Sequence, residues 1–308
     1  MAFEFLSVGV GLIVLIFAGD ALVKGAVNLA LRLGIPALVV SLTVVAFGTS
    51  APELLVSVQA IIDEAPGLAL GNVVGSNTAN VLLVLGVPAL IATLRTSAHE
   101  TRRDYLYMIS GTALFVAFCL TGTLLWWHGL VLLTALTAIL IATFVASRGA
   151  DVELEGAEPG LPGWKLTAFL VLGLIGLPVG AGLLVDGATA IARVYGVSET
   201  VIGLTLVAVG TSLPELATTV MAAVRRHADV ALGNVIGSNL FNLLAIMGIA
   251  VLVGPVPVDD SFFRKDLWVM IGASLLLIPF VFMAHDITRI WGVTLTSLYV
   301  GYIAWALA

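Results

Sequence analysis

The chain has 308 residues, of which 60% are hydrophobic and only 10% are charged. A soluble domain contains about 25% charged residues, and a soluble fold with this composition would leave too much apolar surface in water. The net charge of −6 excludes the basic surface of a nucleic-acid-binding protein. We therefore expect a polytopic membrane protein that is surrounded by a lipid bilayer and has no nucleic acid partner.

Proline, glycine and charged residues divide the apolar sequence into ten predicted membrane-spanning helices. A span needs about 20 residues, so a chain of this length has room for ten. The first predicted helix is not preceded by the basic segment of a signal peptide, and we interpret it as a membrane helix. The predicted spans are 5–31, 37–61, 67–93, 105–121, 125–147, 164–192, 199–223, 229–253, 267–284 and 289–307.

Lysine and arginine residues are distributed unevenly between the predicted loops. With the N-terminus outside, nine lie in loops on the cytoplasmic side and three in outer loops. Loops rich in Lys and Arg stay on the cytoplasmic side of a membrane. We predict a multi-pass protein of the cell (inner) membrane with both termini outside.

The longest polar connector, residues 148–163, divides the chain into an N-terminal half, 1–147, and a C-terminal half, 164–308. It contains four acidic residues and two prolines. We interpret it as a solvated cytoplasmic linker, with cation sensing as the alternative. About fifteen residues are too few to form another domain.

Two motifs occur once in each half, always 162 positions apart. G-T-S-A-P-E-L begins at Gly48 and G-T-S-L-P-E-L at Gly210, while G-N-V-V-G-S-N begins at Gly71 and G-N-V-I-G-S-N at Gly233. Each half has an odd number of predicted spans, so the second half enters the membrane from the opposite side. The sequence therefore predicts an all-α membrane protein of ten transmembrane helices arranged as two inverted five-helix repeats, which is typical of secondary transporters.

Glu53 and Glu215 lie near the middle of apolar spans, at equivalent positions of the two halves. A charged side chain at that depth costs about 2.5 kcal/mol or more, and the motif helices carry no Lys or Arg at the same depth. A bound cation would balance the two carboxylates. The alternative is a pair of protonated carboxyl groups that hydrogen-bond between helices.

Further oxygen atoms surround these carboxylates in the sequence. Pro52 and Pro214 have no N–H, which frees a carbonyl one turn earlier in each helix, and such irregular backbone lines buried cavities in membranes. Calcium prefers about six to eight oxygen ligands. The candidate side-chain ligands beside the carboxylates are Thr49, Ser50, Ser76, Asn80, Thr211, Ser212, Ser238 and Asn242.

Other polar and small residues of the motifs have simpler interpretations. Ser and Asn side chains also join membrane helices by hydrogen bonds, and small residues four apart allow close helix packing. Asp20 and Lys24 lie one helical turn apart and are expected to pair. We expect hydrogen bonds between helices from Asn72, Asn77, Asn234 and Asn239, and close packing at Gly71, Gly75, Gly233 and Gly237.

The paired motifs resemble the two alpha-repeats of the calcium/cation antiporter superfamily, and among its members the prokaryotic sodium/calcium exchangers. The resemblance covers the whole chain. It implies that Glu53 and Glu215 bind calcium and also serve sodium, and that the first and sixth spans slide across a rigid core. The implied metal-binding residues are Thr49, Ser50, Glu53, Ser76, Asn80, Thr211, Ser212, Glu215, Ser238 and Asn242, with the backbone carbonyls of Ala46 and Ala208.

Three features depart from that pattern. Asn80 and Asn242 occupy positions where some relatives carry an acidic residue, which leaves potassium dependence and the number of sodium ions open. Thr78 and Ala79 stand where relatives usually have Ile and Phe. The central linker is too short for the regulatory domain of eukaryotic members.

The predicted function is secondary antiport of calcium against sodium by alternating access. Calcium/proton exchange and potassium-dependent sodium/calcium exchange are alternatives, and a cation channel is an alternative of another class. The sequence contains no Walker motif and no Ser-His-Asp pattern, so we expect neither enzymatic activity nor a cofactor. We expect a monomer whose ligands are calcium and sodium ions.

Overall fold

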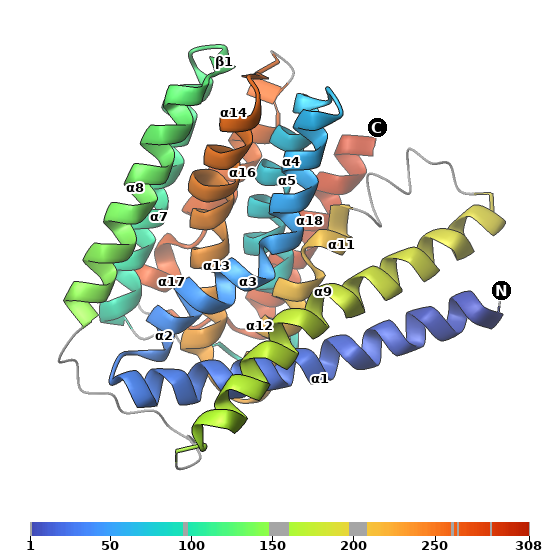
Figure 1. Cartoon of the computed structure of the whole chain (residues 1–308), viewed down its shortest axis with the longest axis vertical. Helices are drawn as coiled ribbons and strands as arrows, with labels where there is room; N and C mark the ends of the chain where they lie inside the picture. Colours follow the sequence, from blue (N-terminus) through green and yellow to red (C-terminus); the bar gives the residue numbers. More distant parts are fainter. Residues whose placement is uncertain are drawn as a thin grey trace.

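Helices make up nearly all regular structure in the computed structural model, which describes residues 2–94, 98–147, 160–196, 208–259, 262–263, 265–283 and 285–307 (Figure 1). Before the linker the helices are α1 (Ala2–Leu33), α2 (Ala37–Val40), η1 (Ser41–Val45), α3 (Ala46–Thr49), α4 (Ala51–Ile62), α5 (Pro66–Ala79), η2 (Asn80–Val84), α6 (Gly86–Ile91), α7 (Ala98–Cys119) and α8 (Trp126–Ser147). After the linker they are α9 (Gly163–Val194), α11 (Ala208–Thr211), α12 (Leu213–Val224), α13 (Ala228–Leu240), η4 (Phe241–Ile246), α14 (Met247–Val253), α16 (Asp266–Leu275), α17 (Ile278–Phe282) and α18 (Arg289–Leu307). Two short antiparallel strands, β1 (Thr123–Leu124) and β2 (Val256–Pro257), join the two halves at one end.

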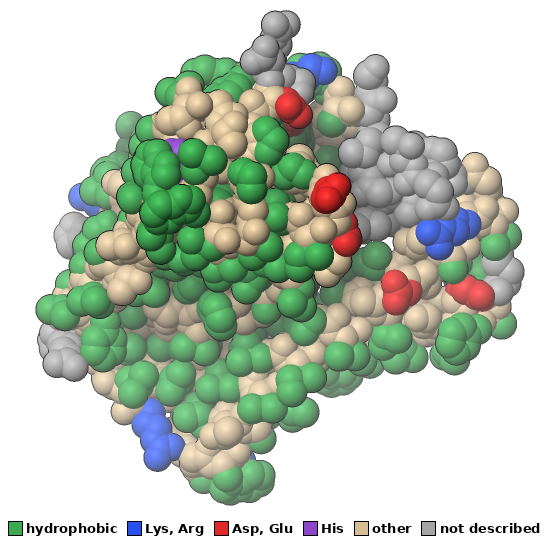
Figure 2. All heavy atoms as spheres, turned by 45° about the horizontal axis from the view of Figure 1, so that its top comes forward, with side chains coloured by type: hydrophobic (Ala, Val, Ile, Leu, Met, Phe, Trp, Pro, Cys, Tyr) green, Lys and Arg blue, Asp and Glu red, His purple; other side chains and the backbone are tan. Residues whose placement is uncertain are grey.

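Five continuous helical segments in the described part of the chain are long and apolar enough to cross a membrane. They are Ala2–Leu33, Pro66–Ile91, Trp126–Ser147, Gly163–Val194 and Ala228–Val253, and a sixth is formed if Ala37–Thr49 and Ala51–Ile62, which meet at a bend of 44°, count as one span. Hydrophobic side chains are spread over the face shown in Figure 2, where charged side chains are few. The polytopic all-α class predicted from the sequence is therefore supported, while the number of ten spans and the inverted relation of the halves stay predictions.

Several predicted spans are interrupted helices. The predicted span 37–61 breaks at Ser50, and 267–284 breaks between α16 and α17. The spans 67–93 and 229–253 each contain a π-helical segment, η2 and η4. The first break was predicted from the proline that follows it. The π-helical segments were not predicted, because no residue type in the sequence indicates where a helix widens its turn. The first part of the predicted span 199–223, up to residue 207, lies outside the described residues.

The two longest helices, α1 and α9, lie side by side and antiparallel along one flank of the molecule (Figure 1). Small residues bring their backbones together: a methyl group built on Gly180 would lie 2.9 Å from the backbone nitrogen of Leu15, and one on Gly173 would lie 2.5 Å from Cβ of Leu22. Glycine allows helices to approach this closely in a membrane. α1 and α9 therefore form a tightly packed pair, which also contacts α12.

α13 occupies the centre of the molecule and is buried from Val230 to Leu240. It packs against α2 and η1 through the two glycines of the second motif. A methyl group on Gly233 would lie 2.7 Å from the carbonyl oxygen of Leu38, and one on Gly237 would lie 2.4 Å from that of Leu42. The predicted close packing is thus confirmed in the second half. A methyl group on Gly71 or Gly75 would have no described residue of another helix within 4 Å, so close packing at these two glycines stays a prediction.

Candidate functional site

The first motif of each half interrupts its helix at the same residue. Ser50 has φ −84° and ψ 6°, and Ser212 has φ −86° and ψ 3°, so both lie just outside helical geometry. The following proline is in the first turn of α4 or α12, where its missing N–H costs little. Glu53 and Glu215 consequently lie in the first turn of a new helix. The dipole of a helix favours a carboxylate at that end.

The candidate ligands are distributed over the two motif regions as follows. Ala46 begins α3 and Thr49 ends it, Ser50 is the break, Glu53 is in α4, Ser76 is in α5 and Asn80 begins η2; Ala208 begins α11 and Thr211 ends it, Ser212 is the break, Glu215 is in α12, Ser238 is in α13 and Asn242 is in η4. The segment η2 contacts α12, and η4 contacts α4, so the segment that contains the asparagine of each half lies beside the glutamate helix of the other half. π-Helical segments are frequent at functional sites.

Both carboxylates are buried, with Glu53 exposing 1% and Glu215 exposing 0% of its surface. The Ser50 hydroxyl donates a hydrogen bond of 3.0 Å to Oε1 of Glu215, which links the two halves directly. The hydroxyls of Thr49 and Ser238 also lie beside the Glu215 carboxylate. The two glutamates are close enough to repel each other electrostatically. The structure therefore joins the two carboxylates in one site.

Several buried oxygen atoms of this site accept no hydrogen bond from any described residue. They are Oε2 of Glu53, Oε2 of Glu215, Oγ of Ser212, Oδ1 of Asn80 and Oδ1 of Asn242. Leaving a buried polar atom unsatisfied costs about 1–3 kcal/mol. Carboxylate, hydroxyl and amide oxygens together are the ligands that a hard cation prefers. The arrangement can thus bind a cation such as calcium or sodium.

Neither the candidate site nor any other group among the described residues brings together three His, Cys, Asp or Glu side chains. The candidate ligand set is instead two carboxylates with neutral oxygens. Two carboxylates balance one divalent cation, whereas nitrogen and sulfur ligands would favour zinc or another transition metal. The composition of the site therefore suits an oxygen-preferring ion.

Asn72 and Asn234 hold the motif helices together, as expected. The amide of Asn72 donates to the carbonyl of Glu53 at 3.1 Å and to the Ser57 hydroxyl at 2.9 Å. The amide of Asn234 makes the equivalent bonds to the carbonyl of Glu215 at 3.3 Å and to the Thr219 hydroxyl at 3.1 Å. Each asparagine thus fixes the backbone beneath a carboxylate. Asn234 also accepts a bond of 3.4 Å from the Thr49 hydroxyl of the other half.

A second set of hydrogen bonds, from Asn77 and Asn239, crosses between the halves. Bonds between helices from these two residues were predicted, but their partners were not. The Asn77 amide donates to the carbonyl of Asn239 at 3.3 Å and to the sulfur of Met270 at 3.9 Å. The Asn239 amide donates to the sulfur of Met108 at 3.7 Å, and its Oδ1 accepts from Asn80 at 3.1 Å. Asn80 therefore has its amide engaged and its oxygen free for the site.

The sequence does contain a signal for these two methionines. Arg102-Arg103-Asp104 precedes Met108 by the same spacing as Arg264-Lys265-Asp266 precedes Met270, and the two segments are again 162 positions apart. This third repeated element is weaker than the other two because only its charged residues and the methionine recur. It extends the correspondence between the halves to α7 and α16.

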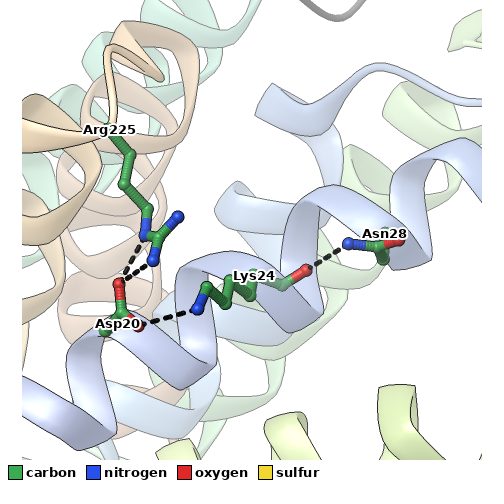
Figure 3. Close-up of polar contacts among 4 residues, drawn as sticks. All are labelled: Asp20, Lys24, Asn28 and Arg225. Carbon is green, nitrogen blue, oxygen red and sulfur yellow. Dashed lines mark hydrogen bonds and ion pairs between the residues drawn. The ribbon is translucent and has the colours of Figure 1, made fainter. Parts of the chain in front are cut away.

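Asp20 and Lys24 pair as predicted, and Arg225 joins them (Figure 3). The Lys24 ammonium lies 3.2 Å from one oxygen of Asp20. The other oxygen accepts hydrogen bonds from Nε and Nη2 of Arg225, at the end of α12. This ion pair connects α1 to the helix that carries Glu215.

A known protein family matches both halves of the chain. The model of the family "sodium/calcium exchanger protein" matches residues 3–145 and again residues 165–308, one match for each half of the chain.

Relatives and solved structures of similar length agree with that match. The chain is 35% identical to the sodium/calcium exchanger MaX1 of Methanosarcina acetivorans, with 97% of each chain covered. It is 36% identical to the inner membrane protein YrbG of Escherichia coli, over 87% of this chain and 85% of YrbG. Structures of the sodium-calcium exchanger NCX_Mj superpose with a TM-score of 0.85 at 34% identity, covering 98% of both chains.

Proposed function

The chain belongs to the sodium/calcium exchanger family, and on that premise we propose that it is a secondary active antiporter that exchanges calcium for sodium by alternating access. The observation that carries this proposal is the hydrogen bond between Ser50 and Glu215 within a buried set of unpartnered oxygens. A site that both halves build lies on helices that contact the α1–α9 pair, so the net charge that bound ions leave on the site can favour or oppose movement of that pair. Ion binding and movement are therefore coupled.

The proposed ion-binding residues are those named from the sequence. Calcium would lie between Glu53 and Glu215, because a divalent cation balances both carboxylates at once. Sodium ions would use the same carboxylates together with the hydroxyls of Ser50, Ser76, Ser212 and Ser238. Competition for shared carboxylates makes the binding of one ion weaken the binding of the other, which exchange requires. No resident cofactor takes part in this scheme.

Access to the site would change by movement of the α1–α9 pair. These helices pack against each other through small residues and contact the central helices chiefly through α12. A ligand shifts the balance between the inward-open and outward-open states only by its different affinity for the two. Binding of calcium or of sodium would therefore allow the pair to slide, whereas an empty, charged site would hold it.

The membrane arrangement that we propose has ten spans in two inverted repeats, 1–147 and 164–308, with the linker 148–163 in the cytoplasm and both termini outside. The reciprocal bonds from Asn77 to Met270 and from Asn239 to Met108 support a two-fold relation between the halves. The two separate family matches also support it. The proposed functional unit is a monomer in the inner membrane, because both halves of the site come from one chain.

Calcium/proton exchange is the second candidate. The observation in its favour is that Glu53 and Glu215 are both desolvated and lie beside each other. Adjacent buried carboxylates favour taking up protons when no cation is bound. Protons could then replace sodium as the counter-ion at the same two side chains.

Transport by purified protein in proteoliposomes tests these candidates. Calcium-45 uptake would be followed with an outward sodium gradient, with only a proton gradient, and with neither. We expect calcium uptake only in the condition with the outward sodium gradient. Uptake driven by protons but not by sodium would favour the second candidate and refute the first. Rapid calcium flux without any counter-ion gradient would instead indicate a channel.

A further inference from the structure

A cavity of about 420 Å³ lies between the last turns of α1, the start of α9 and the turn that joins α12 to α13. None of the residues proposed to bind calcium or sodium lines it. Its polar lining consists of Lys24, Asn28, Trp164, Lys165, Arg225 and His227. We propose that this cavity, here named the α1–α9 pocket, binds the phosphate group of an anionic phospholipid.

Positive charge exceeds negative charge around the pocket. Three lining side chains are cationic, and two carboxylates lie near the lining: Asp20, which contacts Lys24 and Arg225 (Figure 3), and Asp229, which acts on His227. Asp20 serves both Lys24 and Arg225, and Lys165 lies over the Trp164 ring at 5.6 Å. The excess is one positive charge, which the single negative charge of a phospholipid phosphodiester would neutralise.

The pocket is held in shape by Asn28, which makes one hydrogen bond within α1 and one to the opposite wall. The Asn28 amide donates to the carbonyl of Lys24 at 3.0 Å, and its oxygen accepts from the backbone N–H of Leu161 at 3.2 Å. Asn28 thereby ties α1 to the segment that leads into α9. A pre-formed cationic site loses little entropy when a ligand binds.

The apolar part of the lining favours a lipid over a free anion. Val27, Phe169 and Leu172 line the same cavity, and the side chains of Trp164 and Leu172 expose 71% and 62% of their surface. Tryptophan is enriched at the level of lipid headgroups, where one end of the ring is apolar and the other is hydrated. A phospholipid has a phosphate for the cations and acyl chains for these side chains, whereas inorganic phosphate has only the former.

Two of the three cationic residues of the pocket correspond to carboxylates in the other half. Lys24 corresponds to Asp186, and Arg225 corresponds to Asp63. The repeated architecture therefore does not require cations at these positions. Lys24 and Arg225 distinguish the pocket end of the molecule from the equivalent end of the other half. In the membrane orientation proposed above this end faces the cytoplasm, where anionic lipids attract basic residues by about 1 kcal/mol each. The lipid inference rests on that orientation but not on the identity of the exchanged ions.

The environment of His227 agrees with a positive potential in the pocket. Burial and the charge of Arg225 hold the pKa of this imidazole below its ordinary value, against the opposing influence of Asp229. A phosphate group bound beside Arg225 would offset that charge. Lipid binding should therefore raise the pKa of His227, which a merely structural role of the cations would not do.

Lipid binding by the delipidated protein in neutral detergent tests the proposal. Phosphatidylglycerol and phosphatidylcholine would each be titrated and bound lipid counted by native mass spectrometry, without calcium or sodium gradients. We expect Lys165→Gln to weaken phosphatidylglycerol binding about fivefold and to leave phosphatidylcholine binding unchanged. Arg225→Gln should have at least the same effect, but it also breaks the contact with Asp20, so Lys165→Gln is the decisive variant.

Lys265→Gln is the matched control, because Lys265 also lies over a tryptophan ring, that of Trp305 at 4.7 Å, outside the pocket. It should bind phosphatidylglycerol as the unsubstituted protein does. Equal binding by Lys165→Gln and the unsubstituted protein would overturn the proposal. So would loss of bound phosphatidylglycerol to a few millimolar inorganic phosphate, which would indicate a site for free anions. Because no transport is measured, neither result bears on exchange itself.

Discussion

Ser50 donates its hydroxyl hydrogen to the carboxylate of Glu215, although the two residues belong to different halves of the chain. Both side chains are buried, and Ser50 is the residue at which its own helix breaks. The break turns the serine side chain away from a regular helical path and toward the other half. The proline that follows it in the motif thus has a consequence for the site as well as for the helix.

Ser50→Ala should weaken calcium binding, because it removes a donor to Glu215 and one oxygen of the proposed site. A hydrogen bond to a charged group contributes about 1.5–3 kcal/mol, so we expect the KM for calcium to rise by roughly tenfold or more. Sodium-driven calcium-45 uptake over a range of calcium concentrations measures this. Ser110→Ala is the control, since Ser110 is exposed and donates only to the carbonyl of Leu106 in its own helix. An unchanged KM in Ser50→Ala would remove this serine from the site.

Glu53→Gln and Glu215→Gln should each abolish transport while the protein remains folded. Either change leaves a divalent ion with one balancing carboxylate in a buried site, where unbalanced charge is costly. Uptake of calcium-45 and elution from size exclusion chromatography measure transport and folding. Glu64→Gln, on an exposed turn, should behave as the unsubstituted protein. Calcium transport at the normal rate by either site variant would contradict a central role for that carboxylate.

Much of the candidate site follows from sequence because its chemistry is unusual for its surroundings. A carboxylate in an apolar span is rare enough to be noticed, and its recurrence at one offset pairs Glu53 with Glu215. The bond from Ser50 to Glu215 could not be predicted, because it depends on the angle at which two broken helices meet. The bonds from Asn77 and Asn239 to methionine were also not predicted, because the repeat that contains Met108 and Met270 is weak and does not indicate a hydrogen bond.

Asn234→Ala should lower the thermal stability more than Asn72→Ala. Both variants lose two hydrogen bonds to the helix that carries a glutamate, but Asn234 also accepts a bond from Thr49 and is fully buried, whereas Asn72 is exposed in part. Each unsatisfied buried partner costs about 1–3 kcal/mol. Thermal unfolding in detergent, followed by intrinsic fluorescence, gives the two midpoints. A larger decrease for Asn72→Ala would show that burial of the bonds does not determine their contribution.

Helix boundaries were more predictable than the contacts between helices. Apolar runs and loop charges are visible in a sequence, so the outer helices α1, α8, α9 and α18 begin and end within a few residues of the predicted spans. Contacts between helices depend on three-dimensional arrangement. Nothing in the spacing of Asp20 and Lys24 indicated that Arg225, about two hundred residues later, shares the same carboxylate.

Gly237→Ala should destabilise the protein strongly, whereas Gly272→Ala should not. A methyl group on Gly237 would lie 2.4 Å from the carbonyl oxygen of Leu42 and 2.7 Å from Cβ of Ala46, so α13 would have to move away from η1 and α3. Gly272 is also inside a helix, α16, but no described residue comes within 4 Å of such a methyl group. There alanine gains about 0.5–1 kcal/mol from its better helix propensity.

Thermal unfolding of the two glycine variants, measured beside calcium-45 uptake, separates packing from the effect of helix propensity. We expect Gly237→Ala to unfold at a lower temperature and to transport poorly, because Ala46 lies in the helix that ends at Thr49 and the break at Ser50. Gly272→Ala should unfold at the same or a higher temperature and transport normally. If both variants transport at the normal rate and unfold alike, the approach of α13 to the first motif does not position the ion-binding residues.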